Sequence, residues 1–548
     1  MKNKHIIIQI IIIVVAAIFF IPFIGRVHLF DWDEINFAES AREMIVTGDY
    51  LTVRIFFEPF WEKPPLFIWM QVLSMKIFGI NEFAARFPNA LCGIVTLLVI
   101  YNIGRRMYNV RFGIIWAVVY FGSLLPFFYF KSGIIDPWFN IFIFLGVYFW
   151  VLAAENTHLK GTNLQVILSA FFLGLAVLTK GPVAVLVFAV LIFILFLVKK
   201  FRLGLKWSSV LLFIVTLTFI GGFWFLLQMV TGNFDLVRDF IIYQIRLFNT
   251  KDAGHGGFPM YHFVILLIGV FPASVFAIQG HNLKGNIGTE RIFHLAMIIL
   301  LWVVLLLFSL VKTKIVHYSS LTYFPISYLA AYSFYNIMTG EFRYRLWQKI
   351  LLCIIGAVIA LTVILLPVFI LFKQVFIDKG LITHSFTIGN LQADPGWNFS
   401  HSLIGFTLLI GLIFSFFYFK KNKILQIGVL YISSAVFMFL AILFITPGAE
   451  RISQNAAIEF IKSTTNQDVY LCSFYKSYAT LFYHNQQPVD DKKAFNMKWL
   501  TSGDIDKDVY FVLRIDKKNE ILNKYPQVIV LYEKNGYVFG LREAIREQ

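Results

Sequence analysis

Two adjacent carboxylates, Asp33 and Glu34, stand between the first two apolar runs of the chain. The apolar residues that follow them recur at the spacing of one helix face, and Gly48 is typical of a helix end. We therefore predict an amphipathic helix that begins at the two acids. A carboxylate there could act as a general base toward an attacking hydroxyl group. Asp31 or Asp33 could instead be a simple helix cap, although one cap does not require three acids within four residues.

Four more charged residues lie near the ends of apolar runs. Glu62 and Lys63 precede two prolines, Asp136 precedes one proline, and Lys180 stands between two apolar runs that only a Gly-Pro pair separates. A charge near the depth of a bilayer is costly and is usually functional. Each residue also has an ordinary explanation. Lys63 and Lys180 could reach the membrane surface along their apolar stems, and Asp136 could simply start a helix.

The remaining candidates are Arg246 and His255, in the polar stretch 231–259, and Lys314 and Tyr318, at the end of a later apolar run. Taken singly, they could be solvated charges or aromatic residues at the membrane surface. Together with the acids they predict a cavity in which carboxylates act as base or metal ligand and cations hold an anionic lipid headgroup. Such cations, or a bound metal, would stabilise a departing phosphate. Because the sequence has no nucleotide-binding glycine motif, we expect no nucleotide cofactor.

The composition places these residues in a membrane protein. Of the 548 residues, 59% are hydrophobic and 14% are charged, against about 25% charged in soluble domains. The net charge is +16, yet residues 447–548 hold 14 basic and 13 acidic residues. The excess positive charge therefore lies between the apolar runs, where it orients a membrane protein, and we expect no nucleic-acid partner.

Thirteen apolar segments are candidates for membrane-spanning helices, each of which needs about 20 residues. A further apolar stretch at 64–80 is predicted to be a helix that lies in the membrane interface. The thirteen segments are 6–24, 87–104, 112–130, 135–154, 164–179, 182–198, 208–230, 260–280, 292–311, 315–336, 350–372, 402–419 and 424–445.

The basic residues predict the orientation of this mainly α, polytopic bundle. With the N-terminus in the cytoplasm, the inner segments hold 18 basic and three acidic residues, as the positive-inside rule requires. The odd number of spans places the C-terminus on the periplasmic side of the inner membrane. We divide the chain into a transmembrane module, 1–446, with a long first outer loop at 25–86, and a soluble α/β domain, 447–548. The domain is predicted to hold a helix at Gln454–Ser463 and strands at Val469–Ser473, Val509–Arg514, Val528–Tyr532 and Tyr537–Leu541.

Several motifs in this order resemble those of a known family. They are DEINFAESAREMIVTGDY, WEKPPL, IIDPW and LAVLTKGP, followed by KTKIVHYSSLTYFP. The chain resembles the GT-C glycosyltransferases over about residues 1–330. Within them it is most similar to the family of the aminoarabinose (lipid A) transferases and protein O-mannosyltransferases.

This resemblance implies an inverting transfer of a sugar from a polyprenyl-phosphate donor at the outer face of the membrane. The acceptor would be lipid A, another envelope glycan or a protein. Matched motif by motif, the resemblance implies that Asp33 is the catalytic carboxylate, with Glu34 beside it. Glu62 would be a metal ligand or a donor-site ligand, and Lys63 and Lys180 would face the donor phosphate. Asp136 would support this cluster.

The ligands for a divalent cation depart from the family pattern. Gln244 stands where the lipid A transferases have a metal-binding histidine, and His255 lies eleven residues further along. The sequence therefore leaves open whether Glu62 and His255 hold a divalent cation.

Two other classes of protein compete with an enzyme. A secondary transporter or lipid flippase would place its ionisable groups near the midplane of the membrane on broken helices, whereas these candidates lie at the outer ends of the predicted spans. A non-catalytic envelope assembly protein would use the C-terminal domain as a sensor.

Overall fold

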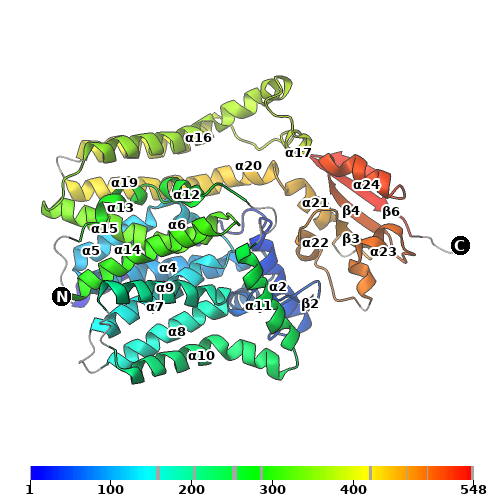
Figure 1. Cartoon of the computed structure of the whole chain (residues 1–548). Coiled ribbons are helices and arrows are strands. Elements are labelled where there is room, and N and C mark those ends of the chain that lie inside the picture. The colour runs from blue at the N-terminus through cyan, green and yellow to red at the C-terminus, as the bar shows by residue number, and fades with distance from the viewer. Residues whose placement is uncertain are drawn as a thin grey trace.

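The protein is a bundle of long helices that ends in a small α/β domain (Figure 1). The computed structural model describes residues 2–155, 161–200, 205–249, 256–283, 288–418, 422–465, 467–489 and 491–544. Helix α1 begins at the opposite end of the bundle from this domain, as an odd number of crossings requires.

Each predicted apolar segment coincides with a helix or with a pair of consecutive helices. In chain order the helices of the bundle and its outer loops are α1 (Lys2–Phe20), α2 (Asp33–Thr47), α3 (Leu66–Phe78), α4 (Glu82–Met107), α5 (Val110–Phe121), α6 (Leu124–Tyr129), α7 (Asp136–Glu155), α8 (Thr162–Lys180), α9 (Val183–Val198), α10 (Trp207–Val230), α11 (Phe234–Asn249), α12 (Tyr261–Gly269), α13 (Ala273–Gly280), α14 (Gly288–Leu310), η2 (Val316–Thr322), α15 (Tyr323–Thr339), α16 (Leu346–Asp378), α17 (Ser385–Asn390), α18 (Phe399–Tyr418), α19 (Lys423–Leu440), η3 (Ala441–Ile445) and α20 (Thr446–Arg451).

The predicted count of thirteen spans is approximate. Among the described residues, eight helices are long and apolar enough to cross a membrane, or nine if α12 and α13, which meet at 111°, form one broken span. Other predicted spans fold as shorter helices, such as α1, α5 and α9. The predicted interfacial helix at 64–80 corresponds to α3.

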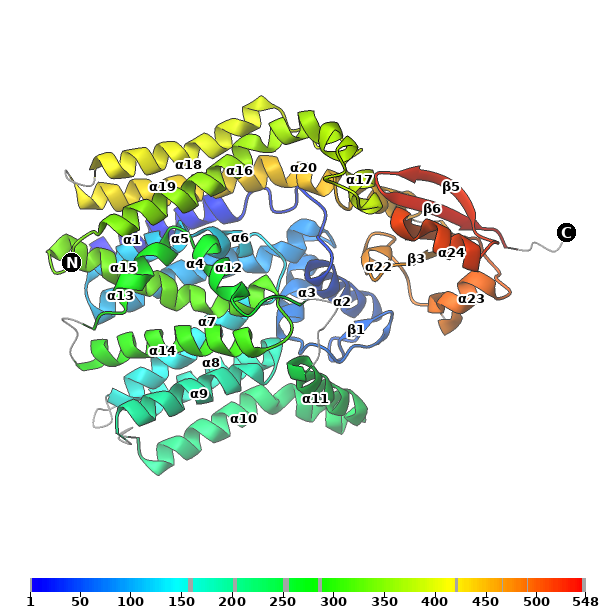
Figure 2. The same cartoon turned by 45° about the horizontal axis from the view of Figure 1, so that its top comes forward.

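The helices differ in how deeply they are buried. The apolar stretch of α7 is 83% buried, whereas that of α10 is 17% buried and that of α16 is 28% buried. Figure 2 shows why: α16, α18 and α19 form one flank of the bundle, α8, α9 and α10 form the other, and α7 lies between them. The exposed faces of α10 and α16 are apolar, which is what a lipid-facing surface requires.

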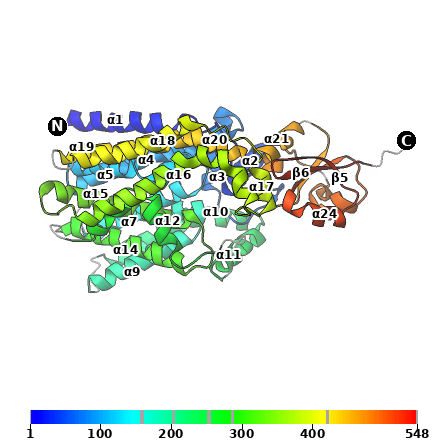
Figure 3. The same ribbon diagram turned by 90° about the horizontal axis from the view of Figure 1, so that it is seen from above.

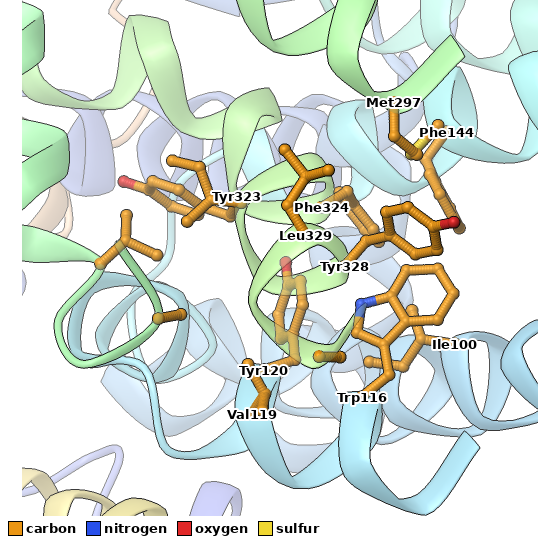
Figure 4. Packing of buried hydrophobic residues seen from close by; sticks show 14 of the residues in the cluster. Ile100, Trp116, Val119, Tyr120, Phe144, Met297, Tyr323, Phe324, Tyr328 and Leu329 are labelled. Carbon is orange, nitrogen blue, oxygen red and sulfur yellow. The ribbon is translucent and has the colours of Figure 1, made fainter. Parts of the chain in front are cut away.

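Aromatic side chains fill the centre of the bundle (Figure 4). The rings of Phe144 in α7 and Phe324 in α15 stack with their centroids 4.4 Å apart. Trp116 in α5 meets Tyr328 edge to face at 5.2 Å, and its indole nitrogen donates to Ser327 Oγ at 3.1 Å. This packing fixes α7, which carries Asp136 of the site described below, against α15, which directly follows η2 and its site residues.

The outer loops gather at the end of the bundle that faces the α/β domain (Figures 1 and 2). Helix α2 and the hairpin of β1 (Arg54–Ile55) and β2 (Glu58–Pro59) belong to the predicted first outer loop. The predicted helix at Asp33 is confirmed as α2, and it ends at Gly48 with a φ of +71°, a conformation that glycine adopts without strain. The stretch 231–259, which we predicted as a loop, contains the helix α11.

The C-terminal domain continues the long axis of the bundle beyond α20 (Figure 3). Its elements are α21 (Asn455–Ser463), β3 (Tyr470–Ser473), α22 (Ala479–Phe482), η4 (Lys492–Phe495), α23 (Met497–Ser502), β4 (Val509–Arg514), η5 (Ile515–Lys517), α24 (Lys518–Lys524), β5 (Ile529–Lys534) and β6 (Tyr537–Arg542). The sheet order is β3-β4-β6-β5, with β3 parallel to β4 and the other pairs antiparallel. All four predicted strands have counterparts at the predicted places.

Candidate active site

A cavity of about 480 Å³ lies at the end of the bundle that faces the α/β domain, where α2, α7, α8, α11 and η2 come together. Eight of the ten residues predicted from the sequence line it, and they come from six separate parts of the chain. They are Asp33, Glu34, Glu62, Lys63, Asp136, Lys180, Arg246 and Tyr318. His255 lies outside the described residues, and Lys314 does not line the cavity.

Asp33, the first residue of α2, directs its carboxylate toward η2. Its Oδ2 lies 3.4 Å from Nε2 of His317, and the Asp33 side chain is 25% exposed. The position that caps α2 is Trp32, which makes no side-chain capping bond within the described chain. Asp31 accepts a hydrogen bond from Ser477 in the C-terminal domain. The explanation of these acids as simple helix caps is therefore wrong.

Glu34 also lines the cavity, but its carboxylate is fully engaged. Arg86 of α4 donates to both of its oxygens, at 2.9 and 2.7 Å. The backbone amides of Phe30 and Gly133 donate at 2.9 and 2.5 Å. Burial raises the pKa of Glu34, yet the charge and hydrogen bonds of Arg86 outweigh this and hold the pKa below its usual range. These contacts hold the segment before α2, α4 and the segment before α7 together around Glu34. They indicate a structural role for Glu34, and its predicted catalytic role stays a prediction.

Asp136 and Lys180 form an ion pair in the wall of the cavity. Lys180 Nζ lies 2.6 Å from Oδ1 of Asp136, which is the first residue of α7. Asp136 is 2% exposed, and its Oδ2 has no hydrogen-bond partner among the described residues. Lys180 ends α8, and its ammonium lies 5.3 Å from the ring centroid of Tyr318. Gly181 follows with a φ of +98°, which allows the tight turn into α9.

Tyr243 of α11 joins the remaining predicted residues. Its hydroxyl donates to Oε2 of Glu62 at 3.4 Å. The ammonium of Lys63 lies 5.5 Å, and the guanidinium of Arg246 5.2 Å, from the centroid of its ring. Tyr243 thus brings an acid and two cations together at one side of the cavity.

Lys314 has a different task from the predicted one. Its ammonium donates to the backbone carbonyls of Phe308, Ser309 and Val311, at 2.9, 2.6 and 2.6 Å. These carbonyls belong to the C-terminal end of α14, where a cation is favoured. The expectation that Lys314 binds phosphate is therefore not supported by its position.

The described residues do not assemble a set of metal ligands. No group of three or more His, Cys, Asp or Glu side chains that could hold a metal occurs in the described part of the chain. Glu62 and Gln244 both line the cavity, but an amide oxygen beside one carboxylate is a weak site for a transition metal. The pair predicted from Glu62 and His255 cannot be placed, because His255 is outside the described residues.

Two residues of the cavity were missed as site residues. His317 faces Asp33, as described above, although the sequence showed it only as one polar residue among several. Lys476 comes from the C-terminal domain, and its ammonium lies 4.1 Å from the ring centroid of Trp32. The spacing of residues in the sequence does not show that His317 lies near Asp33. It does not show the contact of Lys476 with Trp32 either, because that contact depends on how the C-terminal domain docks.

Comparison with known proteins identifies solved structures that share the fold and proteins that are similar in sequence. Residues 62–224 match the family described as dolichyl-phosphate-mannose-protein mannosyltransferase. The fold also matches two solved structures, ArnT from Cupriavidus metallidurans bound to undecaprenyl phosphate and an oligosaccharyltransferase from Archaeoglobus fulgidus in the apo form. The first has a TM-score of 0.78 at 18% identity, covering 98% of this chain and 99% of that chain. The second has a TM-score of 0.50 at 11% identity, covering 93% of this chain and 70% of that chain.

Particular relatives are similar in sequence. The chain is 25% identical over 333 residues to the undecaprenyl phosphate-alpha-4-amino-4-deoxy-L-arabinose arabinosyl transferase of Edwardsiella ictaluri. It is 28% identical over 269 residues to a second such transferase, of Proteus mirabilis. The first match covers 59% of this chain and 58% of the relative, and the second covers 47% and 48%. The chain therefore has the GT-C fold, and the predicted resemblance to the aminoarabinose transferases is confirmed.

Proposed function

We propose that this protein is an integral membrane glycosyltransferase that uses a polyprenyl-phosphate sugar as its donor. The acceptor would be a hydroxyl-bearing envelope molecule, such as lipid A, another glycan or a protein. The observation that carries the proposal is the cavity, in which the carboxylate of Asp33 lies in one space with Lys63, Lys180 and Arg246. Its relatives named as undecaprenyl phosphate aminoarabinose transferases support the same class of donor.

In the proposed reaction, Asp33 removes the proton from the acceptor hydroxyl. The oxygen then attacks the anomeric carbon of the sugar, and the bond from that carbon to the phosphate oxygen breaks. The bonding electrons leave with the polyprenyl phosphate, whose negative charge the cations stabilise. His317, which lies 3.4 Å from Asp33, would orient the carboxylate toward the acceptor.

Inversion of the anomeric centre fits the carboxylates of the cavity. A retaining mechanism that proceeds through a sugar–enzyme intermediate needs a second carboxylate as nucleophile. Of the other carboxylates that line the cavity, Glu34 is held by Arg86 and Asp136 by Lys180, while Asp31 accepts a hydrogen bond from Ser477 and Glu62 accepts one from Tyr243. These engagements favour a single displacement in which Asp33 acts as the base.

The apolar part of the cavity suits a lipid donor. Val183 and Val187 of α9 and Phe308 of α14 line it, together with Lys180. A prenyl chain along these side chains would place its phosphate at the ammonium. We propose that this end of the bundle faces the periplasm, with the N-terminus in the cytoplasm, because the basic residues are concentrated at the other end.

A transfer assay in proteoliposomes tests the proposal. Purified protein is supplied with a set of polyprenyl-phosphate sugars and an envelope extract from a strain that lacks the protein. We expect one donor to add the mass of its sugar to an acceptor and to release polyprenyl phosphate. The variant Lys349→Met changes a cation in α16, away from the cavity, and should transfer normally. Uptake of a substrate without any covalent product would instead identify a transporter.

A further inference from the structure

The C-terminal domain completes one wall of the cavity. Lys476 follows β3, and its ammonium lies 4.1 Å from the ring centroid of Trp32, the residue just before Asp33. Tyr478 of the same domain stacks on Trp32, with ring centroids 5.8 Å apart. A cation from the domain is therefore held in the same cavity as the carboxylate proposed as the base.

The position of Lys476 is fixed by contacts between the domain and the segment before α2. The hydroxyl of Tyr483 accepts from the amide of Leu29 at 2.6 Å. Gln454 Nε2 donates to the carbonyl of Leu29 at 2.8 Å, and Ser477 donates to Asp31. Ser477 is the neighbour of Lys476 in the chain, so docking of the domain sets where the ammonium stands.

Lys476 differs from Lys180 and Lys314. Lys180 is paired with Asp136, and Lys314 donates to three carbonyls. Within the described part of the chain, no carboxylate forms an ion pair with Lys476, and the ring of Trp32 occupies none of its three N–H donors in a conventional hydrogen bond. The ammonium is thus held in place while its donors stay available to a ligand.

Lys476 is also separate from the cations proposed for the donor phosphate. Lys63 lies against the ring of Tyr243 in α11, and Lys180 is paired with Asp136 of α7. Lys476 comes from the C-terminal domain and lies against the ring of Trp32. The cavity therefore has a further cation, which the C-terminal domain supplies.

We propose that Lys476 binds an anionic group of the acceptor and so determines which acceptor is used. This inference rests on the proposed function, because it assigns the second substrate of the same cavity. An anion held by Lys476 would bring the acceptor hydroxyl to Asp33 while the donor phosphate occupies Lys63 and Lys180. The acceptor is then an anionic molecule, and its recognition requires the C-terminal domain.

The test compares Lys476→Met with wild type in the transfer assay, with the envelope extract as acceptor. We expect the variant to need about tenfold more extract for half-maximal transfer, since a charge-assisted hydrogen bond is lost, and to keep the wild-type dependence on donor concentration. Lys476→Arg should restore the wild-type acceptor dependence. Lys524→Met removes a lysine elsewhere on the same domain and should behave as wild type. The labelled product should bind to an anion-exchange resin.

Each contrary result has its own meaning. An unchanged acceptor dependence in Lys476→Met, a changed donor dependence, or a product that is neutral would overturn the role of Lys476. Stabilisation of the protein by undecaprenyl phosphate, measured by thermal melting, should be equal in wild type and Lys476→Met, and a loss in the variant would place Lys476 in the donor site. If wild type itself transfers no sugar, the proposed function fails, independently of Lys476.

Discussion

Two groups of charged residues lie close together at the outer end of the bundle, and they use their charges differently. In α2, Glu39 and Arg42 are fully buried and form a two-point ion pair with both distances at 2.7 Å. Glu43, one residue further, is also fully buried, and burial together with the nearby Glu39 raises its pKa well above the usual range. The raised pKa of Glu43 favours its protonated form, in which the remaining charges of Glu39 and Arg42 cancel.

The second group faces the cavity and keeps part of its charge available. Asp33 has His317 at 3.4 Å and a side chain that is 25% exposed, and the ammonium of Lys63 lies 5.5 Å from the ring centroid of Tyr243. Both groups belong to the same outer region, and α2 carries Asp33 as well as the neutral group. The comparison teaches that charges which stabilise the fold cancel one another locally, whereas charges of the site are left for a substrate.

The strongest way to test this difference is to change Asp33 to Asn. We expect the transfer rate to fall by about 100-fold or more, because a general base contributes about 10²–10⁴. The melting temperature in detergent should stay close to that of wild type, because the Asp33 side chain is partly exposed and an asparagine oxygen can keep its 3.4 Å contact with His317. A variant that transfers at the wild-type rate would remove Asp33 as the base.

The neighbouring change, Glu34→Gln, should have the opposite profile. It leaves the buried guanidinium of Arg86 without its counter-charge, and breaking a buried pair in this way costs about 3–5 kcal/mol. We expect a clear fall in the melting temperature, larger than that of Asp33→Asn, when both are measured in the same detergent. Equal melting temperatures for the two variants would contradict the structural task of Glu34.

The cations of the cavity can be separated from structural ones by Lys63→Met and Lys314→Met. Lys63→Met should weaken binding of undecaprenyl phosphate by about tenfold, the value of one charge-assisted hydrogen bond, with little change in stability. Lys314→Met should lower the melting temperature, because the carbonyls at the end of α14 lose their donor, and should leave the affinity unchanged. Titration followed by thermal melting measures both quantities. If Lys314→Met bound undecaprenyl phosphate more weakly and melted at the wild-type temperature, Lys314 would belong to the donor site.

The smallest expected effect concerns pH. The pKa of Glu43 is raised in the folded protein, so the folded state binds more protons than the unfolded state at pH values above about 4.5, the usual pKa of a glutamate. The contribution of Glu43 to stability is therefore present below that value and is lost as the pH rises toward the raised pKa. Glu43→Gln should flatten this fall in melting temperature between pH 5 and 9 by about a few degrees. An identical pH profile in both proteins would mean that Glu43 is ionised.

Much of the fold and part of the site could be predicted from the sequence. The apolar runs identified the helices. Local motifs identified Asp33, Glu62, Lys63, Asp136 and Lys180, because a charged residue is unusual next to an apolar run or a proline at its end. The strands of the C-terminal domain were found from their composition. Helix α11 was missed because its apolar residues are interrupted by charges that resemble a solvated loop.

The failures have a common physical cause. The sequence shows that a charged residue is present near the membrane, but it does not show which ion-pair or hydrogen-bond partners that residue has in the fold. Glu34 lines the cavity as predicted, yet Arg86 engages its carboxylate, and Lys314, which does not line the cavity, donates to three carbonyls. Conversely, Lys476 belongs to the cavity only because the domain docks on residues 29–32, a contact that joins distant parts of the chain.

The most direct test of the central claim is a structure of the protein with undecaprenyl phosphate, determined by cryo-electron microscopy in lipid nanodiscs. We expect the phosphate in the cavity, within hydrogen-bond distance of Lys63 and Lys180, and the prenyl chain along α9 and α14. A phosphate bound at the lipid-facing surface of α10 or α16, with the cavity occupied only by water, would contradict the assignment of these charges to a donor.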